Sequence, residues 1–292
     1  MKINAGLRVN SLFWISSLRP GEEGPTRRIV EDLKAECRRI GLPFQLYEPR
    51  SVPLLLDALE KIADAARQGM RPIIHLDMHG SAAKGLEIAA AKESASWPAV
   101  VERLKTINIA TQNNLCVVSG ACFGLHAIKQ VTVTEPCPFY MLIGPEQEVT
   151  FGFLEDHIAA FYAEVFLSAD IMKAYESHLA TQLKVFHCEK MLVIALARYI
   201  RKSCRGKGGS ERRERLMSEI FMHGRERTPE NLREVRLQLK SGLRPTQNLV
   251  DRFAGRFLIG KQCGFTLDDL MNAIKQADAA EAHTKARRLR KR

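Results

Sequence analysis

The chain has 292 residues, of which 46% are hydrophobic and 26% are charged. This composition supplies one large core or two smaller ones, so it excludes a wholly disordered chain. No apolar run reaches the roughly 20 residues that span a bilayer, and the first residues do not resemble a secretory leader, so no membrane partner is expected. The seven cysteines never form a C-x-x-C pair. This argues against a disulfide framework or a zinc knuckle and favours the reducing cytoplasm.

The net charge of +11 is distributed unevenly along the chain. Residues 1–180 contain 18 Lys and Arg against 21 Asp and Glu, whereas residues 181–292 contain 26 against 12. Such a split predicts two regions with different roles. We therefore expect a first domain over residues 1–175, a basic helical region over residues 176–284 and a disordered basic tail over residues 285–292.

The first 168 residues alternate between short apolar runs and amphipathic stretches. Residues 7–18 predict a first strand, and Thr26 is the predicted cap of a helix that ends at Gly41. The other predicted strands are residues 44–47, 72–78, 115–119 and 138–143, and the other predicted helices are residues 52–67, 96–106 and 155–167. Strands separated by helices in this way form a mostly parallel sheet that is covered on both faces. The predicted fold class is therefore a three-layer α/β domain.

The basic C-terminal part has helical periodicity instead of this alternation. Helices are predicted over residues 180–200, 211–222, 229–240, 246–257 and 266–280, with a cationic glycine-rich loop over residues 201–213. That loop lacks the spacing of a phosphate-binding loop. One interpretation of the basic surface is a nucleic-acid or acidic-protein partner, and the other is a solvated helical face with a solubilising tail.

Two predicted strands end in segments that carry reactive side chains. Residues 75–81 read HLDMHGS, with His79 directly before Gly80, and residues 117–124 read VVSGACFG, with Cys122 between two glycines. Because the carboxyl ends of neighbouring parallel strands meet at one edge of the sheet, we expect His79 and Cys122 to emerge together. A thiol beside an imidazole provides a nucleophile and a proton donor for a leaving amine.

Small residues around both segments leave room beside the thiol. The backbone N–H groups of Gly80 and Cys122 are therefore the predicted oxyanion donors for a tetrahedral acyl intermediate. Asp77 lies two residues before His79 and is expected to support it. His75, Asp77 and His79 share one face of a strand, as metal ligands can, but no further ligand cluster follows in the sequence. We therefore expect catalysis without a metal or another cofactor.

A strand that ends in His-Gly, followed 43 residues later by a strand that ends in Ala-Cys-x-Gly, resembles the caspase-like cysteine peptidases. This group includes the metacaspases and the bacterial CHAT-type proteases. The resemblance covers residues 7–168 and implies a caspase-like fold, His79 as the catalytic histidine, Cys122 as the nucleophile and Gly80 as an oxyanion donor. The sequence departs from the caspases at Gly120, where they have Gln, and it lacks the Asp that often precedes the metacaspase cysteine.

The resemblance implies a regulated intracellular cysteine endopeptidase that hydrolyses polypeptides, in a setting such as bacterial stress or phage defence. The competing interpretation is a non-catalytic adaptor that has the same fold and a basic surface for nucleic acid or an acidic protein. An α/β-hydrolase is not expected, because the G-x-S-x-G pattern is absent.

Overall fold

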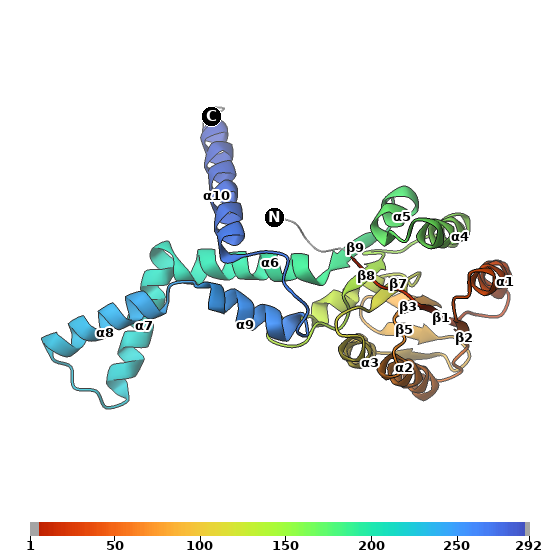
Figure 1. Ribbon diagram of the computed structural model, residues 1–292, viewed down its shortest axis with the longest axis horizontal. Helices are drawn as coiled ribbons and strands as arrows, with labels where there is room; N and C mark the ends of the chain where they lie inside the picture. Colours follow the sequence, from red (N-terminus) through yellow and green to blue (C-terminus); the bar gives the residue numbers. More distant parts are fainter. Residues whose placement is uncertain (1–5, 290–292) are drawn as a thin grey trace. The chain divides into compact units, whose positions relative to one another are not determined.

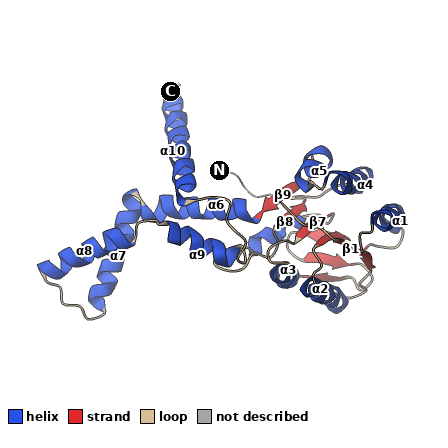
Figure 2. Ribbon diagram, viewed as in Figure 1, coloured by secondary structure: helices blue, strands red, loops and turns tan. Residues whose placement is uncertain are grey.

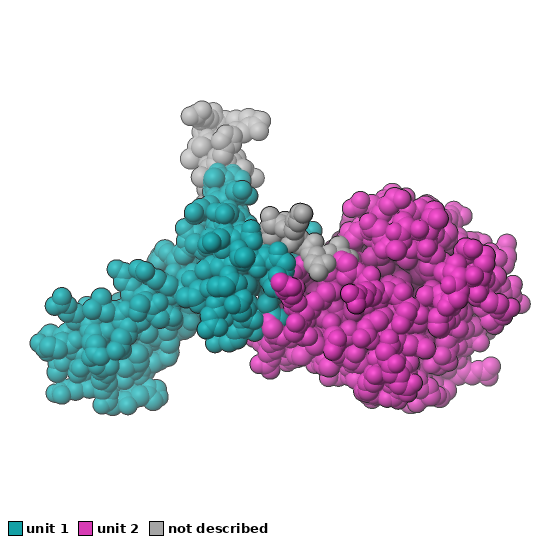
Figure 3. All heavy atoms as spheres, in the orientation of Figure 1, with its two compact units in different colours: residues 1–3, 190–254, 263–292 teal, residues 4–189, 255–262 magenta. Residues whose placement is uncertain are grey.

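The computed structural model of the chain describes residues 6–289, with side chains described for residues 6–281 (Figure 1). Its helices and strands are distinguished in Figure 2. The chain divides into two compact units (Figure 3). The sheet unit contains residues 4–189 and 255–262, and the helical unit contains residues 1–3, 190–254 and 263–292.

A six-stranded sheet with the order β2-β1-β3-β7-β8-β9 forms the centre of the sheet unit. The strands are β1 (Ser11–Ser17), β2 (Phe44–Tyr47), β3 (Pro72–Met78), β7 (Cys116–Ser119), β8 (Met141–Gly144) and β9 (Lys184–His187). The first five are parallel, and β9 runs antiparallel to β8. Every residue of β1 and β3 is buried, as expected of strands covered on both faces. The predicted α/β class with a mostly parallel sheet is confirmed.

Five helices cover this sheet: α1 (Glu23–Ile40), α2 (Val52–Arg67), α3 (Trp97–Ala110), α4 (Phe151–Ser168) and α5 (Ile171–His178). Helices α1, α4 and α5 lie on one face, and α2 and α3 lie on the other (Figure 1). The side chains of Ser51 and Ser96 accept hydrogen bonds from the first turns of α2 and α3, which fixes where these helices begin. Gly41 ends α1 in the left-handed conformation, with φ of 72°.

The core of the sheet unit fills the two layers between the sheet and its helices. Its fully buried side chains include Leu12, Ile15 and Ile73 from the strands, Leu55, Leu59 and Ile62 from α2, and Phe161 and Tyr162 from α4. The buried residues of α2 recur at intervals of three to four, so one stripe of this helix faces the sheet. The packed layers hold the strand ends in place, and the candidate site lies at those ends.

Several local predictions were wrong. Thr26 does not cap α1, which begins at Glu23; it is buried within the helix, and its hydroxyl bonds to Asp77. A small antiparallel sheet follows β3, made of β4 (Gly80–Ser81), β5 (Gly85–Ile88) and β6 (Glu93–Ala95), and it was not predicted. Residues 184–187 were expected inside a helix, but they pair with β8 as β9, because that edge of the sheet is open to a strand.

The helical unit is built from α6 (Cys188–Tyr199), a π-helical turn (Ile200–Cys204), α7 (Gly206–Met222), α8 (Pro229–Gly242), α9 (Gln247–Phe257) and α10 (Leu267–Leu289). The segment 201–213 is thus largely helical instead of a loop. The boundary after the sheet follows residue 189 and not residue 175, because α5 and β9 belong to the sheet unit. Residues 285–289 of the expected disordered tail continue α10, and residues 290–292 lie outside the described residues.

None of the helices in the described part of the chain is long and apolar enough to cross a membrane.

Candidate active site

The register between β3 and β7 brings the two reactive segments together. Leu76 lies opposite Ser119 in this parallel pair. His79 and Cys122 each follow three residues later, just past the ends of their strands at the carboxyl edge of the sheet. The N–H of Gly120 donates to the carbonyl of Leu76 over 2.8 Å, which continues the pairing past the end of β7.

Gly80 lies directly against the backbone of Cys122. A β-carbon added to Gly80 would lie 2.1 Å from the carbonyl oxygen of Cys122, so only glycine fits there. Gly80 also faces Leu86 in the small sheet, and the N–H of Glu87 donates to the carbonyl of His79 over 2.8 Å. That bond makes Gly80 and Leu86 a non-hydrogen-bonded pair, so the N–H of Gly80 points away from β5.

The cysteine is held in a tight turn. The N–H of Gly124 donates to the carbonyl of Ala121 over 3.0 Å, and Phe123 has a left-handed backbone with φ of 59°. For a residue other than glycine this conformation costs about 1–3 kcal/mol. The N–H of Phe123 donates in turn to the carbonyl of Gln147 over 3.0 Å, which ties the turn to the loop after β8. The tie keeps the Cys122 side chain at the rim of the sheet, half-buried.

The thiol of Cys122 contacts the segment that leads into α4. The N–H of Val149 donates to Sγ over 3.4 Å, and Sγ lies 3.8 Å from the carbonyl oxygen of the same residue. Thr150, the next residue, caps the N-terminus of α4. The Cys122 thiol is therefore held between its own turn and the segment that begins α4.

The other six thiols have different surroundings. Cys37, Cys116, Cys137 and Cys188 are buried, while Cys204 and Cys263 are half-buried in the remainder of the chain. Burial raises the pKa of Cys37 to about 11 and raises the pKa of Cys116 further still. These two thiols therefore stay protonated at neutral pH and behave as small apolar side chains.

The imidazole of His79 is paired with a carboxylate that the sequence did not single out. Its Nε2 lies 2.7 Å from Oε2 of Glu22, and the two side chains are 36% and 37% exposed. The same oxygen accepts the backbone N–H of Arg19 over 3.1 Å. Partial burial raises the pKa of Glu22, but the hydrogen bonds from His79 and from the Arg19 N–H outweigh it, so the net pKa is lowered. The only sequence signal for Glu22 is its place in the loop after β1, the strand next to β3.

Asp77, the expected support for His79, directs its hydrogen bonds to Thr26 and Ser16, while its charge still interacts with His79. Oδ2 of Asp77 accepts the hydroxyl of Thr26 over 2.9 Å and lies 3.4 Å from the hydroxyl of Ser16. Asp77 is still inside β3, where its side chain bonds to Thr26 of α1, whereas His79 follows the strand and bonds to Glu22. Burial raises the pKa of Asp77 even though these hydrogen bonds lower it.

His75 is a core residue. Its ring stacks on Trp14 with centroids 3.7 Å apart, and Nδ1 lies 3.0 Å from the hydroxyl of Tyr162. Complete burial lowers the pKa of His75 to about 3, so the ring is neutral at physiological pH. Within the part of the chain that the structure describes, no group of three or more His, Cys, Asp and Glu side chains is arranged to hold a metal ion.

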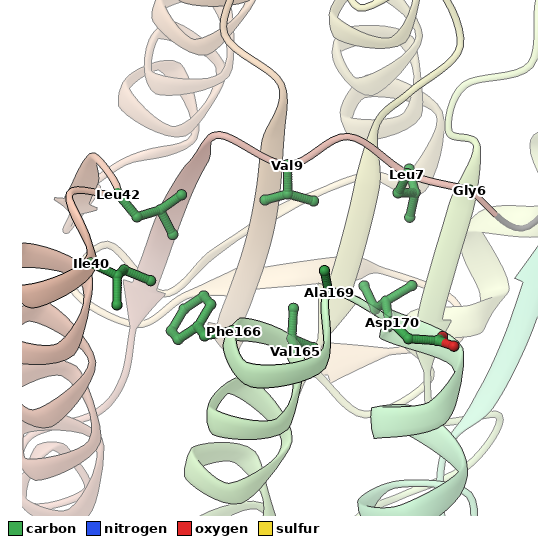
Figure 4. Close-up of a pocket in the computed structure, with 10 residues that line it drawn as sticks. Gly6, Leu7, Val9, Ile40, Leu42, Val165, Phe166, Ala169 and Asp170 are labelled. Carbon is green, nitrogen blue, oxygen red and sulfur yellow. The ribbon is translucent and has the colours of Figure 1, made fainter.

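Two pockets of similar size lie at opposite edges of the sheet. One of about 460 Å³ adjoins the site and is lined by residues that include Arg19, Gly80, Lys84 and Glu87. The other, of about 440 Å³, is apolar and lies at the amino edge among segments that precede β1 and β2 (Figure 4). Of these two, the first reaches the candidate site through Arg19 and Gly80, while neither His79 nor Cys122 is among its lining residues.

The imidazole and the thiol each bond another group in this structure and not each other, among the residues that it describes. Comparison with known proteins adds no assignment: neither a protein-family model nor a curated protein sequence matches the chain. The chemistry of the site therefore has to be argued from its geometry.

Proposed function

We propose that the sheet unit is a caspase-like, cysteine-dependent endopeptidase in which Cys122 is the nucleophile and His79 is the general acid and base. The observation that carries this proposal is the close approach of two strand ends: Leu76 pairs with Ser119, and Gly80, next to His79, lies against the backbone of Cys122. Chemistry in parallel sheets is concentrated at the carboxyl ends of the strands.

The reaction follows from the groups around the thiol. His79 takes the thiol proton, and the thiolate of Cys122 attacks the scissile carbonyl carbon, so that an S–C bond forms and the carbonyl π electrons move to oxygen. The N–H groups of Gly80 and Cys122 donate to this oxyanion. The intermediate then collapses, the C–N bond breaks, and His79 returns its proton to the departing amine. Water hydrolyses the resulting thioester and restores the thiol.

Three further features support this assignment. The Val149 N–H contacts Sγ, and the N-terminus of α4 lies directly after it, so the thiol is held in place at the rim of the sheet. The glycine at residue 80 allows backbone groups to approach the thiol. The adjoining pocket offers space for a side chain of the polypeptide substrate.

The test is peptide cleavage by the full chain and by Cys122→Ala, His79→Ala and the double variant, measured on a fluorogenic peptide library. We expect each single variant to lose at least about 1,000-fold in kcat/KM and the double variant to lose little more, because the two groups act as a unit. Cys204→Ala removes another half-buried thiol and should leave activity unchanged. Full activity in Cys122→Ala would rule out the mechanism.

An adaptor function is the second candidate, and the excess of basic residues in the C-terminal part favours it. Residues 181–292 contain 26 Lys and Arg against 12 Asp and Glu. In the helical unit, Arg201, Lys202, Arg205 and Lys207 line a pocket of about 470 Å³. An electrophilic peptide separates the two candidates: covalent labelling of Cys122 supports the peptidase, whereas polyanion binding without labelling supports the adaptor.

A further inference from the structure

We propose that Glu22 is a positioning residue for His79, so that the site functions as a Cys122–His79–Glu22 triad. This inference rests on the proposed peptidase function and adds to it a residue from a third strand end. The contact between Nε2 of His79 and Oε2 of Glu22, at 2.7 Å, is the shortest polar contact made by either reactive side chain.

The backbone places the Glu22 carboxylate before substrate arrives. The N–H of Glu22 donates to the carbonyl of Arg19 over 3.0 Å, and the N–H of Arg19 donates to Oε2 of Glu22 over 3.1 Å. Gly21 adopts φ of 94° between them, which allows this reciprocal turn. The turn leads directly into α1. The buried face of this helix, which includes Ile29 and Leu33, packs on the sheet and thereby holds the turn that carries Glu22.

The charged side chains nearest to Glu22 and His79, those of Arg19 and Asp77, are bonded to other partners. The guanidinium of Arg19 is bound by the carboxylate of Glu87 through contacts of 2.9–3.0 Å. Asp77, the other carboxylate near His79, is buried and bonded to Thr26 and Ser16. Glu22 is therefore the anion that directly faces the imidazole.

The contact determines which ring nitrogen does the chemistry. When Nε2 carries a proton and donates it to Glu22, Nδ1 is left as the acceptor for the thiol proton. Transfer of that proton gives a thiolate and an imidazolium, and the carboxylate stabilises the imidazolium. The same proton then leaves Nδ1 for the amine when the C–N bond breaks. Glu22 does not change its own protonation in this sequence.

The experiment compares Glu22→Gln, Glu22→Asp and Glu22→Ala in the full chain, with Glu23→Gln as the matched control on the adjacent exposed carboxylate. We expect Glu22→Gln to lower kcat about 10- to 100-fold, the range found for groups that orient a metal-ligating histidine, with KM changed less than about twofold. The acidic limb of the kcat/KM profile, which reports protonation of the resting imidazole, should move to lower pH, because the imidazolium loses its counter-ion. Glu22→Asp should restore part of kcat, and Glu23→Gln should match the parent.

A second readout does not depend on turnover. Imidazole ¹⁵N NMR of the parent should show a proton on Nε2 of His79, and Glu22→Ala should yield a mixture of tautomers. If Cys122→Ala or His79→Ala keeps full activity, the peptidase proposal fails whatever Glu22 does. If both abolish activity while Glu22→Gln keeps the parental kcat, pH profile and tautomer, the role of Glu22 is overturned and the peptidase stands.

Discussion

Titratable residues in and just after β3 differ in how far burial disfavours their charged forms. His75 and Asp77 are buried in β3, whereas His79, just past the end of this strand, is half-exposed and paired with Glu22. Burial disfavours the charged form of both strand residues: it lowers the pKa of His75 to about 3 and raises the pKa of Asp77. Asp77 is thus a buried structural residue, whereas His79, only two residues later, is exposed enough to meet a substrate.

Asp77→Asn should make the stability of the protein less dependent on pH. The ordinary pKa of an aspartate is 3.8, and burial raises the pKa of Asp77 in the folded state despite its hydrogen bonds to Thr26 and Ser16. The folded state therefore binds this proton more tightly than the unfolded state. The resulting stabilisation is complete below pH 3.8 and is lost as the pH rises through the folded-state value. Asn keeps an oxygen for both hydroxyls but carries no charge.

The measurement is the melting temperature between pH 4 and pH 8. Asp77→Asn should gain stability relative to the parent as the pH rises and should then reach a plateau. Asp156→Asn, on an exposed face of α4, is the control and should parallel the parent. A difference between Asp77→Asn and the parent that stays constant over the whole range would contradict the prediction.

At the scale of elements, the site depends on how closely β3 and the turn after β7 approach. The β3–β7 register aligns the two strand ends, and the small sheet of β4, β5 and β6 then turns the chain back at Gly80. A side chain at residue 80 would meet the carbonyl oxygen of Cys122, which is backbone and has little freedom to move. The distance between the end of β3 and the turn that carries Cys122 therefore depends on residue 80 being glycine.

Gly80→Ala should separate His79 from Cys122 and remove most of the activity. The added methyl group would lie 2.1 Å from a backbone oxygen, so the turn that carries Cys122 has to shift. A displacement on the order of 1 Å costs about 100-fold in kcat. Gly152→Ala makes the same chemical change in α4, where an added β-carbon has nothing within 4 Å, and it should keep activity within about twofold. Circular dichroism should show both variants folded, and parental activity in Gly80→Ala would contradict the proposed geometry.

On the scale of the whole molecule, the chain leaves the sheet unit after residue 189 and returns to it for residues 255–262. The returning segment is part of the core, because Phe257 is fully buried and its carbonyl accepts the N–H of Cys137 over 3.0 Å. Lys261 lies over the ring of Tyr140, with Nζ 3.6 Å from its centroid. The helical unit is thus an insertion followed by an extension, and cutting the chain after residue 189 would remove part of the core of the sheet unit.

The basic charge of the C-terminal part predicts binding to polyanions that weakens with salt. Replacing Lys202 and Lys207 by Gln in the pocket of the helical unit should weaken binding to duplex DNA or RNA without changing turnover of a short peptide. The slope of log K against log salt should become less negative by about 0.9 for each phosphate that the variant no longer neutralises. Replacing the exposed Lys34 and Lys61 in the sheet unit by Gln is the control of equal charge. If the protein does not bind polyanions, or if salt does not weaken the binding, the prediction fails and the basic residues serve only as a solvent-exposed charged surface.

The sequence alone determined the α/β class, most strands and helices of the sheet unit, and the approach of the strand end at Gly80 to the one at Cys122. These follow from local periodicity and from the rule that parallel strands place their ends at one edge. Only the tertiary structure decided which side chains meet after the strands end: Glu22 contacts His79, and Asp77 bonds to Thr26 and Ser16. It also decided that residues 184–187 form β9 and that residues 255–262 return to the core. Periodicity reports which face of a regular element is buried. It does not report where side chains point once a strand has ended, or which distant segment completes a sheet, because contacts between residues far apart in the chain determine both.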